Sequence, residues 1–183
     1  LATDVVRFEQ LLGDGTDDAL ERATTLYRGD LLDGIAVHDP SFEEWLSNER
    51  QRLRQAMEDA LTRLIERSLA ASATERAAVA ARRLLALDPL RETACRALMQ
   101  IDAERSQTAQ ALRLFETLRD RLHRELGVKP EPATQLLYDS IRSRAAAPSA
   151  APGPVEAPAA VEPPLPSRPS IAVLPFLNLS GDP

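Results

Sequence analysis

Apolar residues recur at every third or fourth position through most of the first 144 residues, which is the period of an amphipathic helix. The longest pattern predicts one helix over residues 42–70, from the apolar positions Phe42, Trp45, Leu46, Leu53, Met57, Ala60, Leu61, Leu64 and Ile65. Shorter patterns predict six more helices over about 1–12, 17–29, 72–88, 88–101, 106–127 and 132–141. We therefore expect an all-α fold of about seven helices joined by short turns.

Residues that favour helix ends mark the limits of these segments. The expected N-terminal caps are Asp17, Ser41 with Glu44, Ser72 with Glu75, Asp88 and Ser106, with Pro89 and Pro132 as first helical residues. Gly13 with Gly15, Gly29 and Gly127 are expected to end the helices that precede them.

One spacing indicates a repeat of helical hairpins. Ala111 and Phe115 lie four positions apart, as do the small and large residues on the second helix of a tetratricopeptide repeat. Ala77 and Ala81 hold the equivalent places 34 residues earlier, and Pro89 follows where such a repeat ends. The Trp and Leu-Gly signature of the first helix is missing. A tetratricopeptide-like array is the expected architecture.

The aromatic residues at helical positions allow two interpretations. Tyr27, Trp45 and Phe115 could form a platform for a ligand, but aromatic side chains on apolar helix faces belong to the core far more often. We expect all three in the core.

Proline divides the chain. Eight of the 14 prolines fall between Pro148 and Pro169, in a stretch of Ala, Pro, Ser, Val and Glu. Such a segment lacks the apolar mass to offset its ordering entropy. We expect a helical domain over residues 1–144, a disordered Pro/Ala-rich linker over 145–169, and a short strand in 170–183.

Composition narrows the class of protein. The chain has 183 residues, 44% hydrophobic but only 4% aromatic, with a net charge of −6 and a single cysteine. The negative charge disfavours direct duplex binding, and one cysteine builds neither a disulfide framework nor a cysteine-based zinc site. The longest apolar run, Ile171 to Leu177, is far shorter than the roughly 20 residues of a membrane helix. We expect a cytoplasmic protein without membrane contact.

The candidate chemistry is sparse. Arg50, Arg52 and Arg54 could form a phosphate-binding stripe, but carboxylates surround them and a solvated face of ion pairs is the favoured interpretation. His38 and His123 have no matching nucleophile, and Cys95 lies in an apolar helical pattern. The acidic cluster Asp14, Asp17 and Asp18 lacks a calcium-loop pattern. We expect no enzyme, no cofactor and no metal.

Five segments of the chain match a known family in their order and in their spacing. They are Leu26–Leu32 with Tyr27 and Gly29; Trp45 with Glu49–Leu53, which includes Arg50 and Arg52; Leu87–Glu92 with Asp88 and Pro89; Ala111–Glu116 with Phe115; and Glu125–Pro130 with Gly127. Together they resemble the bacterial transcriptional activator domain of the antibiotic-regulatory class of activators, over nearly all of residues 1–144. The segment from Pro169 to Pro183 resembles the start of a TolB-like amino-terminal domain.

The resemblance implies a function. Members of this class carry a winged-helix DNA-binding domain immediately before the module, and that domain is not among these residues. We therefore expect a regulatory and assembly module of a transcriptional activator, and a segment of a longer regulator. Its partners would be proteins: the winged helix, the transcription machinery or a second copy. DNA would be reached only through the winged helix. The alternative is an adaptor segment of a signalling protein that carries a cyclase or kinase domain.

Overall fold

A computed structural model describes residues 3–34 and 39–146, and these residues form seven helices and no strand. The helices are α1 (Asp4–Asp14), α2 (Asp17–Leu26), α3 (Pro40–Ala70), α4 (Thr74–Leu87), α5 (Glu92–Glu104), α6 (Thr108–Leu126) and α7 (Pro132–Ala146). The all-α prediction is confirmed. The predicted linker and C-terminal strand lie almost wholly outside the described residues, except that α7 continues two residues past position 144.

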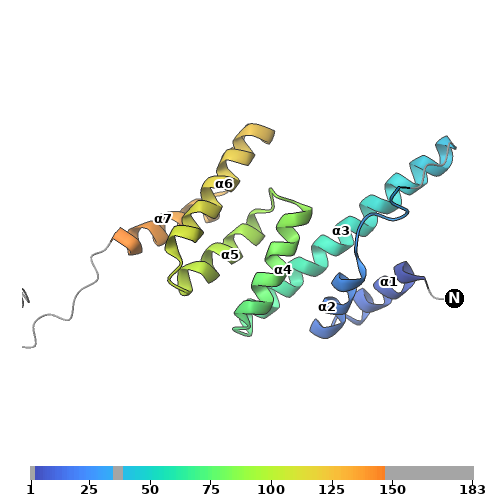
Figure 1. Cartoon of the computed structure of the whole chain (residues 1–183), viewed down its shortest axis with the longest axis horizontal. Coiled ribbons are helices and arrows are strands. Elements are labelled where there is room, and N and C mark those ends of the chain that lie inside the picture. The colour runs from blue at the N-terminus through green and yellow to red at the C-terminus, as the bar shows by residue number, and fades with distance from the viewer. Residues whose placement is uncertain (1–2, 35–38, 147–183) are drawn as a thin grey trace, which may run out of the picture. The chain divides into compact units, whose positions relative to one another are not determined.

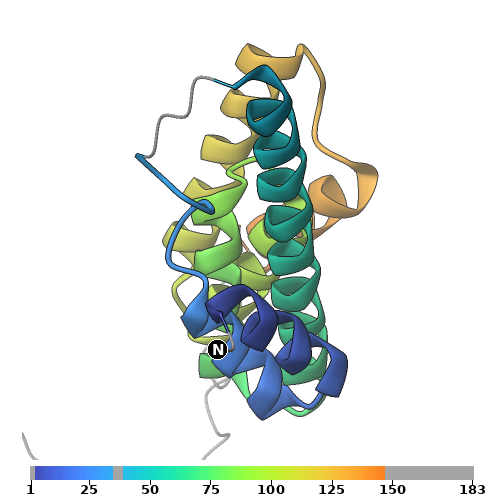
Figure 2. The same ribbon diagram turned by 90° about the vertical axis from the view of Figure 1, so that its right-hand side faces the viewer.

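Helix α3 has 31 residues and organises the first half of the array. Helices α2 and α4 pack on it, and α1 packs on α2. In two perpendicular views the first turns of α3 extend past α1 and α2 (Figures 1 and 2). The longest helix therefore has a packed part and a projecting end.

The core consists of two clusters of buried side chains that share α5. The first joins α1 to α5, and the second joins α5, α6 and α7. Ala94, Leu98 and Ile101 of α5 belong to the first cluster, while Cys95 and Met99 belong to the second. Successive hairpins are thus connected through the two faces of one helix.

The 34-residue repeat is visible in the turns as well as in the helices. Ser72 and Ser106 both adopt the left-handed conformation, with φ of 56° and 62°. The amide that follows each serine donates back across the turn, Ala73 to the Ser68 carbonyl at 2.8 Å and Gln107 to the Asp102 carbonyl at 2.7 Å. Ala77, Ala81, Ala111 and Phe115 are buried, as predicted.

Several predicted helix starts are wrong. Thr16, and not Asp17, caps α2, and Asp39 with Pro40 starts α3 in place of the Ser41–Glu44 box. Ser72 and Ser106 end the preceding helix because their left-handed backbone closes its last turn. Asp88 and Pro89 lie in a turn, and α5 begins only at Glu92. The predicted ends at Gly15 and Gly127 are confirmed, with φ of 66° and 68°. The predicted end at Gly29 is wrong, because α2 already ends at Leu26, and Gly13 lies inside α1.

Candidate interaction site

The segment between α2 and α3 is braced against α3 by two arginines. Arg50 donates from Nε to the Leu31 carbonyl at 2.7 Å and from Nη2 to the Leu32 carbonyl at 2.8 Å. Arg54 donates to the Asp30 carboxylate at 2.6 Å. Three contacts from one helix therefore fix the course of residues 30–32.

Tyr27 connects this loop to the core. Its ring lies 6.0 Å from that of Phe8, and its hydroxyl donates to Asp30 at 3.1 Å. Burial, followed by the hydrogen bond to Asp30, raises the pKa of the Tyr27 hydroxyl. The hydrogen bond from Arg54 is the main cause that lowers the pKa of Asp30. Tyr27 packs at the edge of the core, partly as predicted, with a polar contact that the sequence did not indicate.

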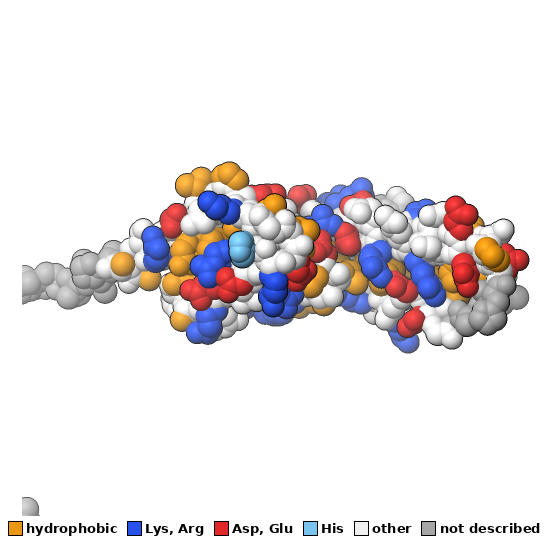
Figure 3. Space-filling view, turned by 90° about the horizontal axis from the view of Figure 1, so that it is seen from above, with side chains coloured by type: hydrophobic (Ala, Val, Ile, Leu, Met, Phe, Trp, Pro, Cys, Tyr) orange, Lys and Arg blue, Asp and Glu red, His pale blue; other side chains and the backbone are white. Residues whose placement is uncertain are grey.

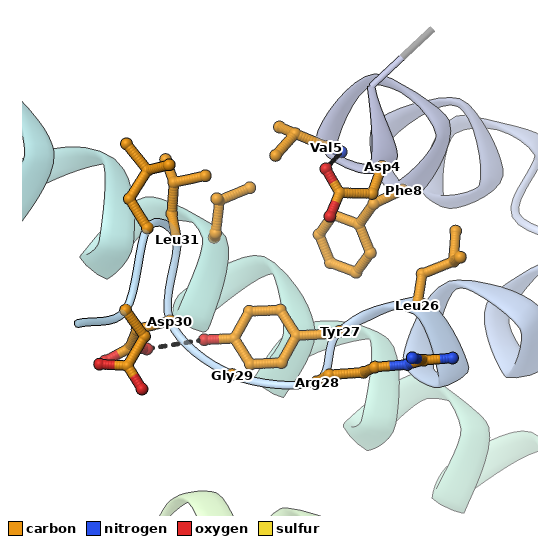
Figure 4. A pocket seen from close by; sticks show the side chains of 12 residues that line it. Asp4, Val5, Phe8, Leu26, Tyr27, Arg28, Gly29, Asp30 and Leu31 are labelled. Carbon is orange, nitrogen blue, oxygen red and sulfur yellow. Dashed lines mark hydrogen bonds between the residues drawn. The ribbon is translucent and has the colours of Figure 1, made fainter. Parts of the chain in front are cut away.

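A cavity of about 430 Å³ opens between α1, the braced loop and α3; we call it the loop pocket. Its wall is formed by Asp4, Val5, Phe8, Leu26, Tyr27, Arg28, Gly29, Asp30, Leu31, Leu32, Asp33 and Leu53. Figure 4 shows the rings of Phe8 and Tyr27 on one side of the opening and Leu31 across from them. A Cβ at Gly29 would meet no atom within 4 Å.

The arginine stripe is occupied by contacts within the molecule. Arg52 pairs with Glu49 at 2.6 Å and with Glu9 of α1 at 2.5 Å, and these two hydrogen bonds raise its pKa. Arg50 and Arg54 hold the loop as described. On the face seen in Figure 3, acidic and basic side chains are interspersed. Arg52 and Arg54 are paired with carboxylates, as predicted, but none of these pairs has four-residue spacing, and Arg50 donates to backbone carbonyls instead of pairing with a carboxylate.

Trp45 corrects the sequence interpretation. Its side chain is 52% exposed, so its assignment to the core is wrong. It lies on the projecting end of α3. Its ring centroid is 5.5 Å from that of Phe42, the one aromatic neighbour that Trp45 has among the described residues. Periodicity identifies the apolar face of a helix but does not show where along that face the neighbouring helices end. The two rings form an aromatic pair on a projecting helix.

The turn between α4 and α5 is fixed by charge. The Asp88 carboxylate accepts from the Leu90 amide at 2.9 Å and lies 3.3 Å from the Arg91 guanidinium. Arg91 also pairs with Glu58 of α3, which is only 9% exposed. Asp88 and Pro89 thus shape a turn that joins α3 to α5, and Pro89 itself is exposed.

The remaining motif residues lie in and beside the second cluster. Phe115 is 2% exposed and its ring stacks on that of Tyr138 at 4.1 Å, so its core assignment is confirmed. Ala111 is fully buried beside it. The Gly127 amide donates to the His123 carbonyl at 3.0 Å and closes α6. Pro130 follows in the partly exposed connection to α7.

A polar junction at the start of α7 was not predicted. The Glu92 carboxylate accepts from the Glu131 amide at 2.9 Å and from the Thr134 hydroxyl at 2.5 Å. Arg96 donates to the same hydroxyl at 2.8 Å and to the Glu131 carboxylate at 2.7 Å. Because Glu92 and Thr134 are 42 residues apart, local sequence patterns carry no signal for this contact.

Among the described residues, the candidates for catalysis or metal binding lie apart, with the cysteine on α5, the histidine on α6 and the acidic cluster on α1 and α2. Burial raises the pKa of the Cys95 thiol to about 12, so it behaves as the buried hydrophobe that was expected. His38 lies outside the described residues, and His123 is exposed on α6. Asp17 pairs with Arg67 at 3.1 Å. Within the described ranges, no cluster of three potential metal ligands occurs and no helix is long and apolar enough to span a membrane.

A model of the bacterial transcriptional activator domain matches residues 3–142, which is most of the chain. No curated protein matches the chain.

Proposed function

Because the chain belongs to the bacterial transcriptional activator domain family, we propose that it is the regulatory and protein-interaction module of an antibiotic-regulatory activator, with DNA bound by a winged-helix domain that precedes it in the full regulator. Its protein partners are the winged helix, the transcription machinery or a second copy. The TolB-like continuation of residues 170–183 is part of the same proposal.

The observation that carries the proposal is the exposed Trp45 beside the half-buried Phe42. Large aromatic side chains left exposed on a rigid helix are the anchors that protein interfaces most often use. Trp45 is 52% exposed, and the ring of Phe42 on the same helix lies 5.5 Å from its ring. We infer that this end of α3 contacts a protein partner.

The contacts of Arg50, Arg52 and Arg54 within the molecule support the proposal that these three arginines do not bind DNA. Phosphate binding requires guanidinium groups that are free to replace counterions. Arg52 is held between two carboxylates, and Arg50 and Arg54 are committed to the loop. A phosphate would have to break these contacts.

A tethering experiment tests the proposal. The 183-residue chain is fused to a DNA-binding protein of known operator, and transcription is measured from a bacterial reporter that carries this operator. We expect the tethered chain to activate the reporter. Trp45→Ala should reduce activation strongly, because truncating an aromatic anchor costs an interface about 2 kcal/mol or more.

Val79→Ala is the matched control, since Val79 is 54% exposed and lies on α4, away from the aromatic pair. It should activate like the parent. A tethered chain that leaves transcription unchanged, or equal loss with both variants at equal protein level, would refute the proposed role of Trp45 and its surface.

A further inference from the structure

Two helices of the array extend beyond their neighbours. The first turns of α3 pass α1 and α2, and in both perpendicular views the last turn of α6 passes α4 and α5 (Figures 1 and 2). We call residues 39–48 the α3 end and residues 121–129 the α6 end. Every residue of α6 beyond Leu122 is exposed. The two ends lie at separate places along the array in Figure 1, so a contact between them has to join two copies of the chain.

Both ends expose large apolar side chains. On the α3 end, the Trp45 side chain is 52% exposed. On the α6 end, Leu126 and Val128 are 59% and 47% exposed. These two residues are two positions apart, so their Cα atoms lie within about 7 Å of each other. An indole ring placed over their side chains would remove apolar surface from water on both copies.

The α3 end is acidic. Its three charged residues are Asp39, Glu43 and Glu44, which give it a net charge of −3. The Asp39 carboxylate accepts from the Phe42 amide and keeps its charge. None of the three carboxylates forms an ion pair within the part of the chain that the structure describes, whereas the arginine stripe that follows is matched by three other carboxylates.

The α6 end is basic. Arg121, Arg124 and Lys129 outnumber its one carboxylate, that of Glu125, so its net charge is +2. The next carboxylates along the chain, at positions 120 and 131, are already paired with arginines, while the four charged groups of the α6 end form no ion pair among the described residues. The charges of both ends are therefore available to a partner.

We propose that the α3 end of one copy docks on the α6 end of a second copy. The indole of Trp45 lies over Leu126 and Val128, and the opposite net charges of the two ends attract each other. The cationic groups of Arg124 and Lys129 favour an indole face over an aliphatic surface.

The charges also set the geometry of the contact. Two α3 ends, or two α6 ends, would bring like charges together, so the contact is head to tail and not symmetric. Each copy then keeps one unused end, and further copies can add. The contact area is that of two helix tips, which is the small class of interface, below about 1,200 Å², found in transient complexes.

The inference rests on the proposed function in one respect, because it names a second copy as the protein partner of Trp45. Association through these ends would bring several copies of the regulator together. One α3 end would remain free on each assembly.

Sedimentation velocity of the 183-residue chain between about 10 and 500 μM tests the proposal in the range of a weak interface. The parent should sediment faster as its concentration rises, without stopping at a dimer, and added salt should reverse the increase. Trp45→Ala and Leu126→Asp should each remain monomeric, because each disables one end. Both side chains are exposed, so far-UV circular dichroism should match that of the parent.

A mixture of the two variants gives the sharpest test. Trp45→Ala keeps its α6 end and Leu126→Asp keeps its α3 end, so together they should form a 1:1 dimer that neither forms alone and that does not grow. Val79→Asp is the matched control, since Val79 is 54% exposed on α4, outside both ends, and it should associate like the parent.

A parent that is monomeric at about 500 μM or stops at a dimer, a mixture that stays monomeric, or equal loss with Val79→Asp would overturn the proposal. The measurement involves no reporter. A monomeric chain that still activates transcription when tethered would therefore contradict this inference and leave the proposed function intact.

Discussion

Truncating one aromatic residue in the core and one on the projecting end of α3 should change the free energy of unfolding by different amounts. Phe115→Ala removes a ring that is 2% exposed and stacks on Tyr138 at 4.1 Å. Such a change costs about 3–5 kcal/mol, a large part of the 5–15 kcal/mol that stabilises a typical domain. Trp45→Ala removes a ring that is 52% exposed and touches Phe42, so its cost should be about 1 kcal/mol.

Urea unfolding measures the loss of unfolding free energy that each substitution causes. The signal should be far-UV circular dichroism, because Trp45 is the chain's one tryptophan and its removal abolishes the usual fluorescence signal. With an unchanged slope, the difference in midpoint gives the change in the free energy of unfolding. Phe115→Ala should shift the midpoint several times further than Trp45→Ala.

A Trp45→Ala cost above about 2 kcal/mol would refute this reasoning, because a ring of that value belongs to a core. It would also remove the main support for a partner surface on α3. A Phe115→Ala cost below about 1 kcal/mol would show that the second cluster is not tightly packed.

Three further predictions concern polar groups that are partly or wholly buried. Glu92→Ala removes the acceptor for the Glu131 amide and the Thr134 hydroxyl, so it should cost about 1–3 kcal/mol and increase hydrogen exchange in the first turn of α7; unchanged exchange would contradict this role. Burial raises the pKa of Asp102, which is 4% exposed; its contribution to stability is therefore present below the unfolded pKa near 4 and lost as pH rises through the folded pKa. Asp102→Asn should accordingly be more stable than the parent at pH 7, with the difference vanishing towards pH 4, and a variant less stable at pH 7 would show that Arg82 and Arg105 outweigh burial. Cys95, with a pKa raised to about 12, should react with a thiol reagent at pH 8 only after unfolding, and rapid reaction of the folded chain would contradict its burial.

The sequence predicts what short-range periodicity controls. The seven helices, the buried places of Ala111 and Phe115, and the end of α6 at Gly127 all follow from apolar spacing or from one backbone preference. Helix starts are harder, because several residues near each start compete for the same role. Ser72 satisfies a capping pattern, yet its left-handed backbone ends the preceding helix.

The functional features depend on contacts between distant residues. Arg50 reaches the Leu31 carbonyl from 19 positions away, and without that contact the loop pocket would have no fixed wall. Trp45 looks like a core residue because it continues the apolar face of α3, and only the extent of the neighbouring helices shows that this part of the face is uncovered. Local patterns carry neither kind of information.

The claim that these helices supply protein contacts, and leave DNA to another domain, is tested most directly by a duplex titration of the chain alone. Fluorescence anisotropy at about 50 mM salt gives electrostatic binding its best conditions. With a net charge of −6 and with Arg50, Arg52 and Arg54 in contacts within the molecule, we expect a Kd weaker than about 100 μM. Micromolar or tighter binding that weakens steeply with added salt would contradict the account and identify the arginine stripe as a nucleic-acid surface.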